Sequence, residues 1–188
     1  VDEGIDTAHA LGDLSYCANN KDAGLSAAIG GGCSVRQDEH TNAYASLARG
    51  GIYKPVSYVI EVKNSSNEKI KEWKDSSTKA VDSQVAYMLT DILADKAARQ
   101  MNFGAQSFSF GFTVPNVWTA SKTGTTDDSR GNAKDSWMMS YSPVVAAGAW
   151  SGNHDGSALG SSSNTLPLIH IRRCRRYPVC GFRGSPHL

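Results

Sequence analysis

Alternating apolar residues mark residues 52–62 as an expected strand. The apolar side chains at every second position there are Val56, Tyr58, Ile60 and Val62. A period of two predicts a half-buried strand, and Pro55 favours an edge position or a late start. Residues 64–67, Asn-Ser-Ser-Asn, have turn chemistry. Residues 68–73 are therefore expected to return as the second strand of a hairpin.

Helical spacing of apolar residues predicts a helix that includes residues 43–48. The segment 34–37, Ser-Val-Arg-Gln, matches a capping box at its start. Gly50 and Gly51 are expected to end it in a left-handed cap.

A second, clearer helix is expected over about residues 82–99. Asp82 or Ser83 is suited to cap its start. Its apolar stripe, which we expect to pack into the core, consists of Val85, Met88, Leu89, Ile92 and Leu93. The weak periodicity of residues 102–117 predicts a partly ordered loop.

Three β-branched or aromatic runs follow, over residues 117–126, 136–143 and 144–153, with a polar turn after the first. Short strands separated by turns predict an antiparallel meander.

The Gly-rich residues 24–35 lack the spacing of a phosphate loop, so they predict a flexible connection or a tight backbone approach.

Length and composition indicate one globular domain. The chain has 188 residues, of which 40% are hydrophobic and 20% charged. It contains no apolar run of 18 residues that would predict a membrane span, and its acidic opening, without a Met, does not resemble a signal peptide. We expect a longer protein, with any anchor or export signal ahead of Val1.

Charge is distributed unevenly along the chain. Residues 166–188 carry five Arg and no acid, whereas the remaining residues carry 14 basic and 18 acidic side chains, a net charge of −4. The body therefore lacks the basic surface that nucleic-acid binding requires.

Two of the four cysteines, Cys17 and Cys33, lie near each other in sequence. They suit either a disulfide, if the protein is exported, or two separate buried thiols. A zinc site with His9 and His40 is a weaker alternative, because no C-x-x-C pair supports it, and we expect no metal.

The segment Ser121–Asp128, SKTGTTDD, carries the candidate chemistry. Lys122 supplies a positive charge, and Thr123 and Thr125 supply hydroxyls on one face of a strand. Gly124 allows another backbone to approach closely. These groups suit a peptide-like substrate that ends in a carboxylate, although a solvated edge strand would show the same pattern.

The order of these elements resembles the C-terminal half of the transpeptidase domain of class A penicillin-binding proteins. The Lys-Thr-Gly tripeptide corresponds to that family's third active-site motif. The resemblance also covers AGLSAAIGGG (23–32), TNAYASLARGGIYKPVSYVIEV (41–62) and AYMLTDIL (86–93), and in all spans roughly residues 8–157. Two departures are Ser121, commonly Gly in the family, and Trp137-Met138, usually Trp-Phe.

The resemblance implies an α/β (α+β) fold, a mainly antiparallel sheet packed by helices and truncated at its N-terminal side. It implies a serine-type D,D-transpeptidase that cross-links peptidoglycan stem peptides, reacts with β-lactams, needs no cofactor and lies on the outer side of a bacterial cell membrane. Lys122, Thr123 and Thr125 would hold the substrate carboxylate, beside Gly124. The Thr125 N–H would be one oxyanion donor.

The family's nucleophile belongs to a Ser-x-x-Lys motif that comes before the helix at 41–48. Two spacing matches here, Ser66 with Lys69 and Ser76 with Lys79, follow that helix, as does Ser65-Ser-Asn67, a match to the second motif. We reject all three and expect the nucleophile ahead of Val1. The fragment alone is then expected to be inactive.

Alternatives to this interpretation are a serine β-lactamase or D,D-carboxypeptidase of the same fold, or a non-catalytic binding module. The expected organisation is the C-terminal part of a transpeptidase domain over 1–157, a linker over 158–165 and a basic tail over 166–188 outside the domain. The tail suits phosphate or membrane contacts, metal binding through Cys174 and Cys180, or a foreign or disordered segment, which we favour.

Overall fold

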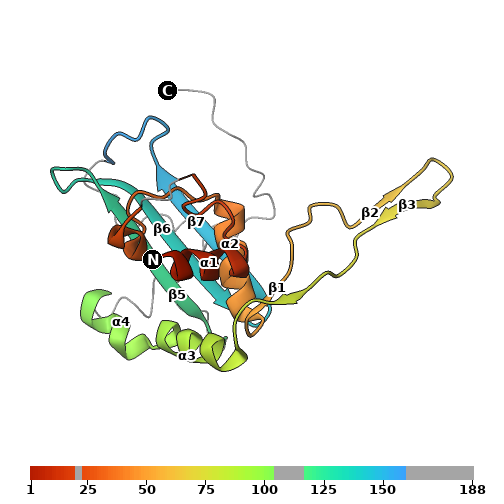
Figure 1. Cartoon of the computed structure of the whole chain (residues 1–188), viewed down its shortest axis with the longest axis horizontal. Coiled ribbons are helices and arrows are strands. Elements are labelled where there is room, and N and C mark those ends of the chain that lie inside the picture. The colour runs from red at the N-terminus through yellow and green to blue at the C-terminus, as the bar shows by residue number, and fades with distance from the viewer. Residues whose placement is uncertain (20–22, 104–116, 160–188) are drawn as a thin grey trace. The chain divides into compact units, whose positions relative to one another are not determined.

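A computed structural model describes residues 1–19, 23–103 and 117–159 (Figure 1). The expected linker from residue 160 on, the basic tail and most of the expected loop at 102–117 lie outside these residues. The chain divides into two compact units. The described part of the first comprises residues 1–19, 23–95, 118–121 and 139–148, and that of the second comprises 96–103, 117, 122–138 and 149–159.

Groups of helices and groups of strands follow one another along the described part of the chain (Figure 1). The helices are α1 (Asp2–Leu11), the 3-10 helix η1 (Leu25–Ile29), α2 (Gln37–Ala48), α3 (Ser83–Ala94) and α4 (Lys96–Phe103). The strands are β1 (Ile52–Tyr53), β2 (Glu61–Lys63), β3 (Lys69–Glu72), β4 (Thr78–Lys79), β5 (Ala120–Asp127), β6 (Ala133–Ser142) and β7 (Val145–Gly152). No helix of the described ranges is long and apolar enough to cross a bilayer.

The predicted meander is confirmed, because β5, β6 and β7 are hydrogen-bonded in that order. The connections, 128–132 and 143–144, are too short for parallel strands, so the sheet is antiparallel. In the first turn the Asp128 carboxylate accepts hydrogen bonds from the backbone N–H groups of Arg130 and Asn132, both at 2.8 Å. These bonds hold the chain reversal between β5 and β6.

The C-terminal end of α2 has the predicted glycine cap. Gly50 lies in the left-handed region at φ +68°. Its N–H donates to Leu47 O, and that of Gly51 donates to Ser46 O, both at 2.9 Å, which is the Schellman pattern. The predicted capping box at the other end is wrong: α2 begins at Gln37 after Arg36, without a side-chain cap, and Ser34 lies too far outside the helix.

The core of the first unit forms where α2 and α3 meet residues of the sheet. Leu47, Ala86, Ala120 and Tyr141 are buried together. The Tyr141 hydroxyl donates to Thr90 Oγ1 at 3.0 Å, so the polar end of this buried ring is satisfied. Burial raises the pKa of the neighbouring Tyr44 to about 12, with smaller effects from Tyr141 and Asp13.

The expected single helix over 82–99 is two helices, interrupted at Asp95. Asp82 caps α3 as predicted, since its carboxylate accepts from the Gln84 N–H at 2.9 Å. The prediction that the apolar stripe is core is largely wrong: Leu93 packs against the core, but the other four are exposed, namely Val85, Met88, Leu89 and Ile92. The large Tyr141 ring packs against α3, where it contacts the small residues Ala86 and Thr90.

The expected strand over 52–62 is also mostly wrong. Only β1 and the start of β2 are strands, and Tyr58 and Ile60 are 79% and 78% exposed. Side chains hold the intervening segment instead, with Tyr58 bonded to Asp38 at 2.6 Å and Lys54 to Asp75 at 2.6 Å. The hairpin itself is confirmed, as β2 pairs antiparallel with β3. Its turn is held by Asn64, whose side chain accepts from two backbone N–H groups.

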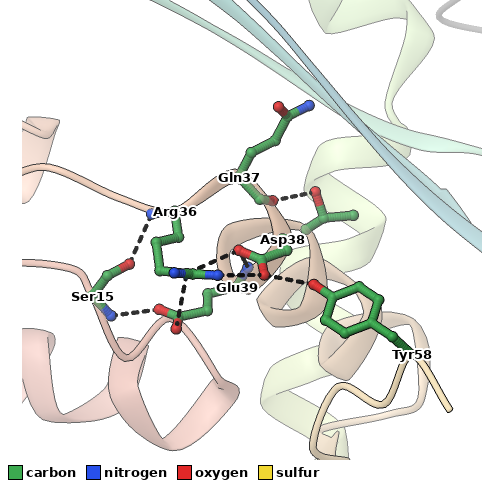
Figure 2. Close-up of polar contacts among 7 residues, drawn as sticks. Ser15, Arg36, Gln37, Asp38, Glu39 and Tyr58 are labelled. Atoms are coloured by element: carbon green, nitrogen blue, oxygen red, sulfur yellow. Dashed lines mark hydrogen bonds and ion pairs between the residues drawn. The ribbon is translucent and has the colours of Figure 1, made fainter. Parts of the chain in front are cut away.

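A polar network surrounds the first turn of α2 (Figure 2). Asp38 accepts from the Arg36 guanidinium at 3.0 and 3.2 Å and from the Tyr58 hydroxyl, and the Arg36 hydrogen bond is the main cause that lowers the pKa of Asp38. Ser15 bonds Glu39 through its N–H and Arg36 through its hydroxyl. The network therefore attaches the segment after α1 and the segment after β1 to α2.

Cys17 and Cys33 form a disulfide, with their Cα atoms 4.7 Å apart. The zinc alternative consequently lacks its thiolates, and its histidines have other partners: His9 contacts Tyr16 O, and His40 contacts Asp13.

Inside the bridged loop, a Cβ on Gly31 would lie 2.7 Å from Ser26 Cβ. The tight backbone approach expected for the Gly-rich segment is therefore present.

Gly50 and Gly51 allow a matched test of the cap. Gly50→Ala meets no atom within 4 Å and should cost about 1–2 kcal/mol, from the left-handed backbone alone. Gly51→Ala has the same strain at φ +88°, and its Cβ would lie 2.5 Å from Val81 O. It should cost about 1–3 kcal/mol more. Urea unfolding followed by tryptophan fluorescence measures both, and equal losses would contradict the packing of Gly51 on Val81.

The disulfide closes a loop with a sequence separation of 16 and should stabilise the fold by about 3 kcal/mol. Replacing Cys17 and Cys33 by Ser should therefore lower Tm by roughly 10 °C. Reduction with dithiothreitol should reproduce that fall in a Cys174→Ser/Cys180→Ser control, which keeps only this pair. If dithiothreitol leaves the control's Tm unchanged, the bridge does not form.

Candidate functional site

The Lys-Thr-Gly segment lies on β5, as predicted. Within the described part of the chain, β5 is an outer strand of its sheet, so one edge of its backbone has no neighbouring strand there. Lys122 and Thr125 are exposed, whereas Thr123 and Gly124 are half-buried. The substrate-binding roles of Lys122, Thr123, Gly124 and Thr125 stay a prediction.

Two contacts fix the register of β5 on β6. The hydroxyls of Ser121 and Ser140 are 2.9 Å apart, and a Cβ on Gly124 would lie 3.4 Å from that of Trp137. Both pairs fit one antiparallel register, because Gly124 is three residues after Ser121 and Trp137 is three residues before Ser140. Side chains alternate along a strand, so Lys122 and Gly124 share the face of Trp137. Thr123 and Thr125 lie on the opposite face.

The Lys122 ammonium donates to Thr123 O at 2.6 Å. This bond is exposed, and an exposed hydrogen bond to a backbone carbonyl is readily exchanged for a charged acceptor. The Lys122 side chain thus lies on one face of β5, and the hydroxyls of Thr123 and Thr125 lie on the other. The geometry is therefore compatible with the anion-binding chemistry expected from the sequence.

The residue before the lysine has a structural role that the sequence did not indicate. Ser121 is buried and contacts Ser140, whose hydroxyl also reaches Ala120 O at 3.4 Å. A serine at this position thus has a polar partner on the next strand. The pairing of two serines 19 residues apart could only be found once the register of the hairpin was known.

The rejected Ser-x-x-Lys matches do not form nucleophile–base pairs. Lys69 forms an ion pair with Glu72 at 2.6 Å, and Lys79 forms one with Asp82 at 2.9 Å. Ser66 lies in the turn between β2 and β3, where its N–H bonds Asn64. An activated serine needs a base within hydrogen-bond reach, and these lysines are held by carboxylates instead.

Comparison with known proteins gives one consistent family. The family model described as the penicillin-binding protein transpeptidase domain matches residues 10–165 of this chain. Penicillin-binding protein 1A/1B of Bacillus subtilis (strain 168) is 29% identical over 167 residues, covering 84% of this chain and 17% of the relative. Penicillin-binding protein 2D of the same organism is 30% identical over 130 residues, covering 68% and 18%.

Solved structures show the same fold. The chain matches PonA1 of Mycobacterium tuberculosis in complex with penicillin V with a TM-score of 0.69 and 23% identity, covering 86% of this chain and 44% of that one. It matches the imipenem acyl-enzyme complex of penicillin-binding protein A from M. tuberculosis with a TM-score of 0.64 and 21% identity, covering 92% and 41%.

The chain spans about a fifth of the length of these curated relatives and less than half of these solved chains. The family match, in contrast, covers most of the chain and includes the whole β5–β7 sheet with its Lys-Thr-Gly strand. The fold is the mixed helix and antiparallel sheet expected from the sequence. The chain belongs to the penicillin-binding protein transpeptidase domain family.

Proposed function

We propose that these residues are the C-terminal part of a peptidoglycan D,D-transpeptidase domain that binds penicillin. The intact enzyme would attack a D-alanyl-D-alanine stem peptide with a serine and transfer the acyl group to an amine of a neighbouring strand. The observation that carries the proposal is the Lys-Thr-Gly segment on an outer strand, within a chain of this family.

In this proposal Lys122 and the hydroxyls of Thr123 and Thr125 bind the carboxylate of the substrate or drug. A fixed cation and hydroxyl donors form strong, charge-assisted hydrogen bonds to such a group. The Thr125 N–H at the free edge would be one donor to the oxyanion, and a donor of this kind contributes about 10²–10³ in rate. Gly124 has no side chain, so the substrate backbone could approach the strand closely there and pair with it.

The nucleophile lies outside these residues in this proposal, because the serines that match its spacing have lysines engaged by carboxylates. In this proposal residues 1–157 would be the C-terminal part of the domain, and the protein would act outside the cytoplasmic membrane. The Cys17–Cys33 disulfide supports this location, since such bridges persist in oxidising compartments.

Labelling of the gene product that carries this sequence with a fluorescent penicillin tests the proposal. Lys122→Ala should lower the second-order rate constant of acylation by about 10²-fold, because it removes the cation that binds the drug carboxylate. Lys134→Ala, on the neighbouring strand, is the matched control and should change the rate by about twofold at most.

Mass spectrometry of the labelled protein should show no penicillin on Ser66 or Ser76. Equal rates for the wild type and Lys122→Ala would contradict the assigned role of β5. Absence of any covalent adduct in the gene product would favour a non-catalytic binding module instead.

A further inference from the structure

A carboxylate and two indoles lie together on the β6–β7 hairpin, in the second unit. The two-residue connection 143–144 joins Ser142 to Val145. Counting back from this pair along both strands places Trp137 opposite Trp150 and Asp135 opposite Gly152. The indole rings agree with this register, since their centroids are 6.3 Å apart with an interplanar angle of 56°.

The Trp150 indole extends along β7 over Gly152. A Cβ on Gly152 would lie 2.9 Å from Cη2 and 3.0 Å from Cε2 of that ring, so only a glycine leaves room for it. Because Gly152 is opposite Asp135, the ring covers the position next to the Asp135 side chain. Trp150 itself is 42% exposed, so part of this aromatic surface faces solvent.

Asp135 has an unsatisfied acceptor in this setting. Its Oδ1 atom is buried and has no hydrogen-bond partner among the residues that the structure describes. Buried carboxylate oxygens are normally paired with a donor or a cation. The adjacent Lys134 is on the other face of β6 by strand alternation, so it does not supply this charge.

A primary ammonium fits these groups best. It carries three donors for a carboxylate, and its positive charge is attracted to the faces of indole rings within about 6 Å. A neutral alcohol of the same shape would lack the charge, and an anion would be repelled by Asp135. The face is also that of Lys122 and Gly124, because Gly124 lies opposite Trp137.

We propose that Asp135, Trp137 and Trp150 form a binding site for a primary alkylammonium group, of the kind carried by the acyl acceptor. The site would hold the amine of the acceptor strand on the same sheet that binds the acyl donor through β5. This inference rests on the proposed transpeptidase function for the identity of the amine, but the ammonium preference itself is independent of acylation.

Fluorine NMR of the chain labelled with 5-fluorotryptophan tests this site. The chain has four Trp, and single Trp→Phe variants assign the four resonances. The probes are n-butylammonium chloride and its neutral counterpart n-butanol, at equal ionic strength set with sodium chloride. The resonances of Trp137 and Trp150 should shift saturably with the ammonium, and binding should be at least about fivefold tighter than that of the alcohol.

Asp135→Asn should weaken ammonium binding by about fivefold or more, whereas Asp127→Asn, an exposed carboxylate on β5, should leave it unchanged. Equal binding of alcohol and ammonium to the wild type would overturn the proposal, whatever the stability of the variants. So would shifts confined to Trp73 and Trp118. These outcomes are separable from failure of the transpeptidase assignment, which penicillin labelling measures.

Discussion

The pairing of β5 with β6 in one register is the constraint on which the candidate site depends. The Ser121–Ser140 contact and the approach of Gly124 to Trp137 define the same alignment. A shift by one residue would exchange the two faces of the strand. Lys122 would then leave the face of the tryptophans, and the threonines would occupy it. The chemistry of the segment is therefore a property of the hairpin as well as of the tripeptide.

The rest of the first unit holds the beginning of this hairpin. Ala120 and Tyr141, which belong to β5 and β6, are buried with residues of α2 and α3. The Tyr141–Thr90 hydrogen bond attaches α3 to that core, and the glycine cap ends α2. The disulfide and the polar network around Asp38 attach segments outside the core. Helix packing thus holds Ala120, the first residue of β5, within the first unit.

Sequence patterns correctly predicted the elements that are determined by neighbouring residues and that the packing of the folded chain does not change. The meander, the Asp82 cap, the β2–β3 hairpin and the Gly50-Gly51 cap follow from turn, capping and alternation chemistry within a few residues. The order of the motifs identified the family, since Lys-Thr-Gly on a strand after the α3 segment is specific in combination. The expected anion-binding roles of Lys122, Thr123 and Thr125 rest on that resemblance and stay predictions.

The errors have a common physical cause. Apolar spacing shows that a segment is amphipathic, but not which side chains a neighbour accepts. The Tyr141 ring packs against the side of α3 that carries Ala86 and Thr90. The helix therefore buries these two small residues and leaves Met88 and Ile92 exposed. Tyr58 follows strand alternation but bonds Asp38 through its hydroxyl. Asp135 likewise lies opposite Gly152 because of the register of β6 on β7, which no local sequence pattern predicts.

The structure of the gene product with a bound penicillin tests the central claim most directly. We expect the drug carboxylate within hydrogen-bond distance of Lys122 Nζ and of a hydroxyl of Thr123 or Thr125, with the drug along the outer edge of β5. A penicillin whose carboxylate contacts none of these groups would contradict it.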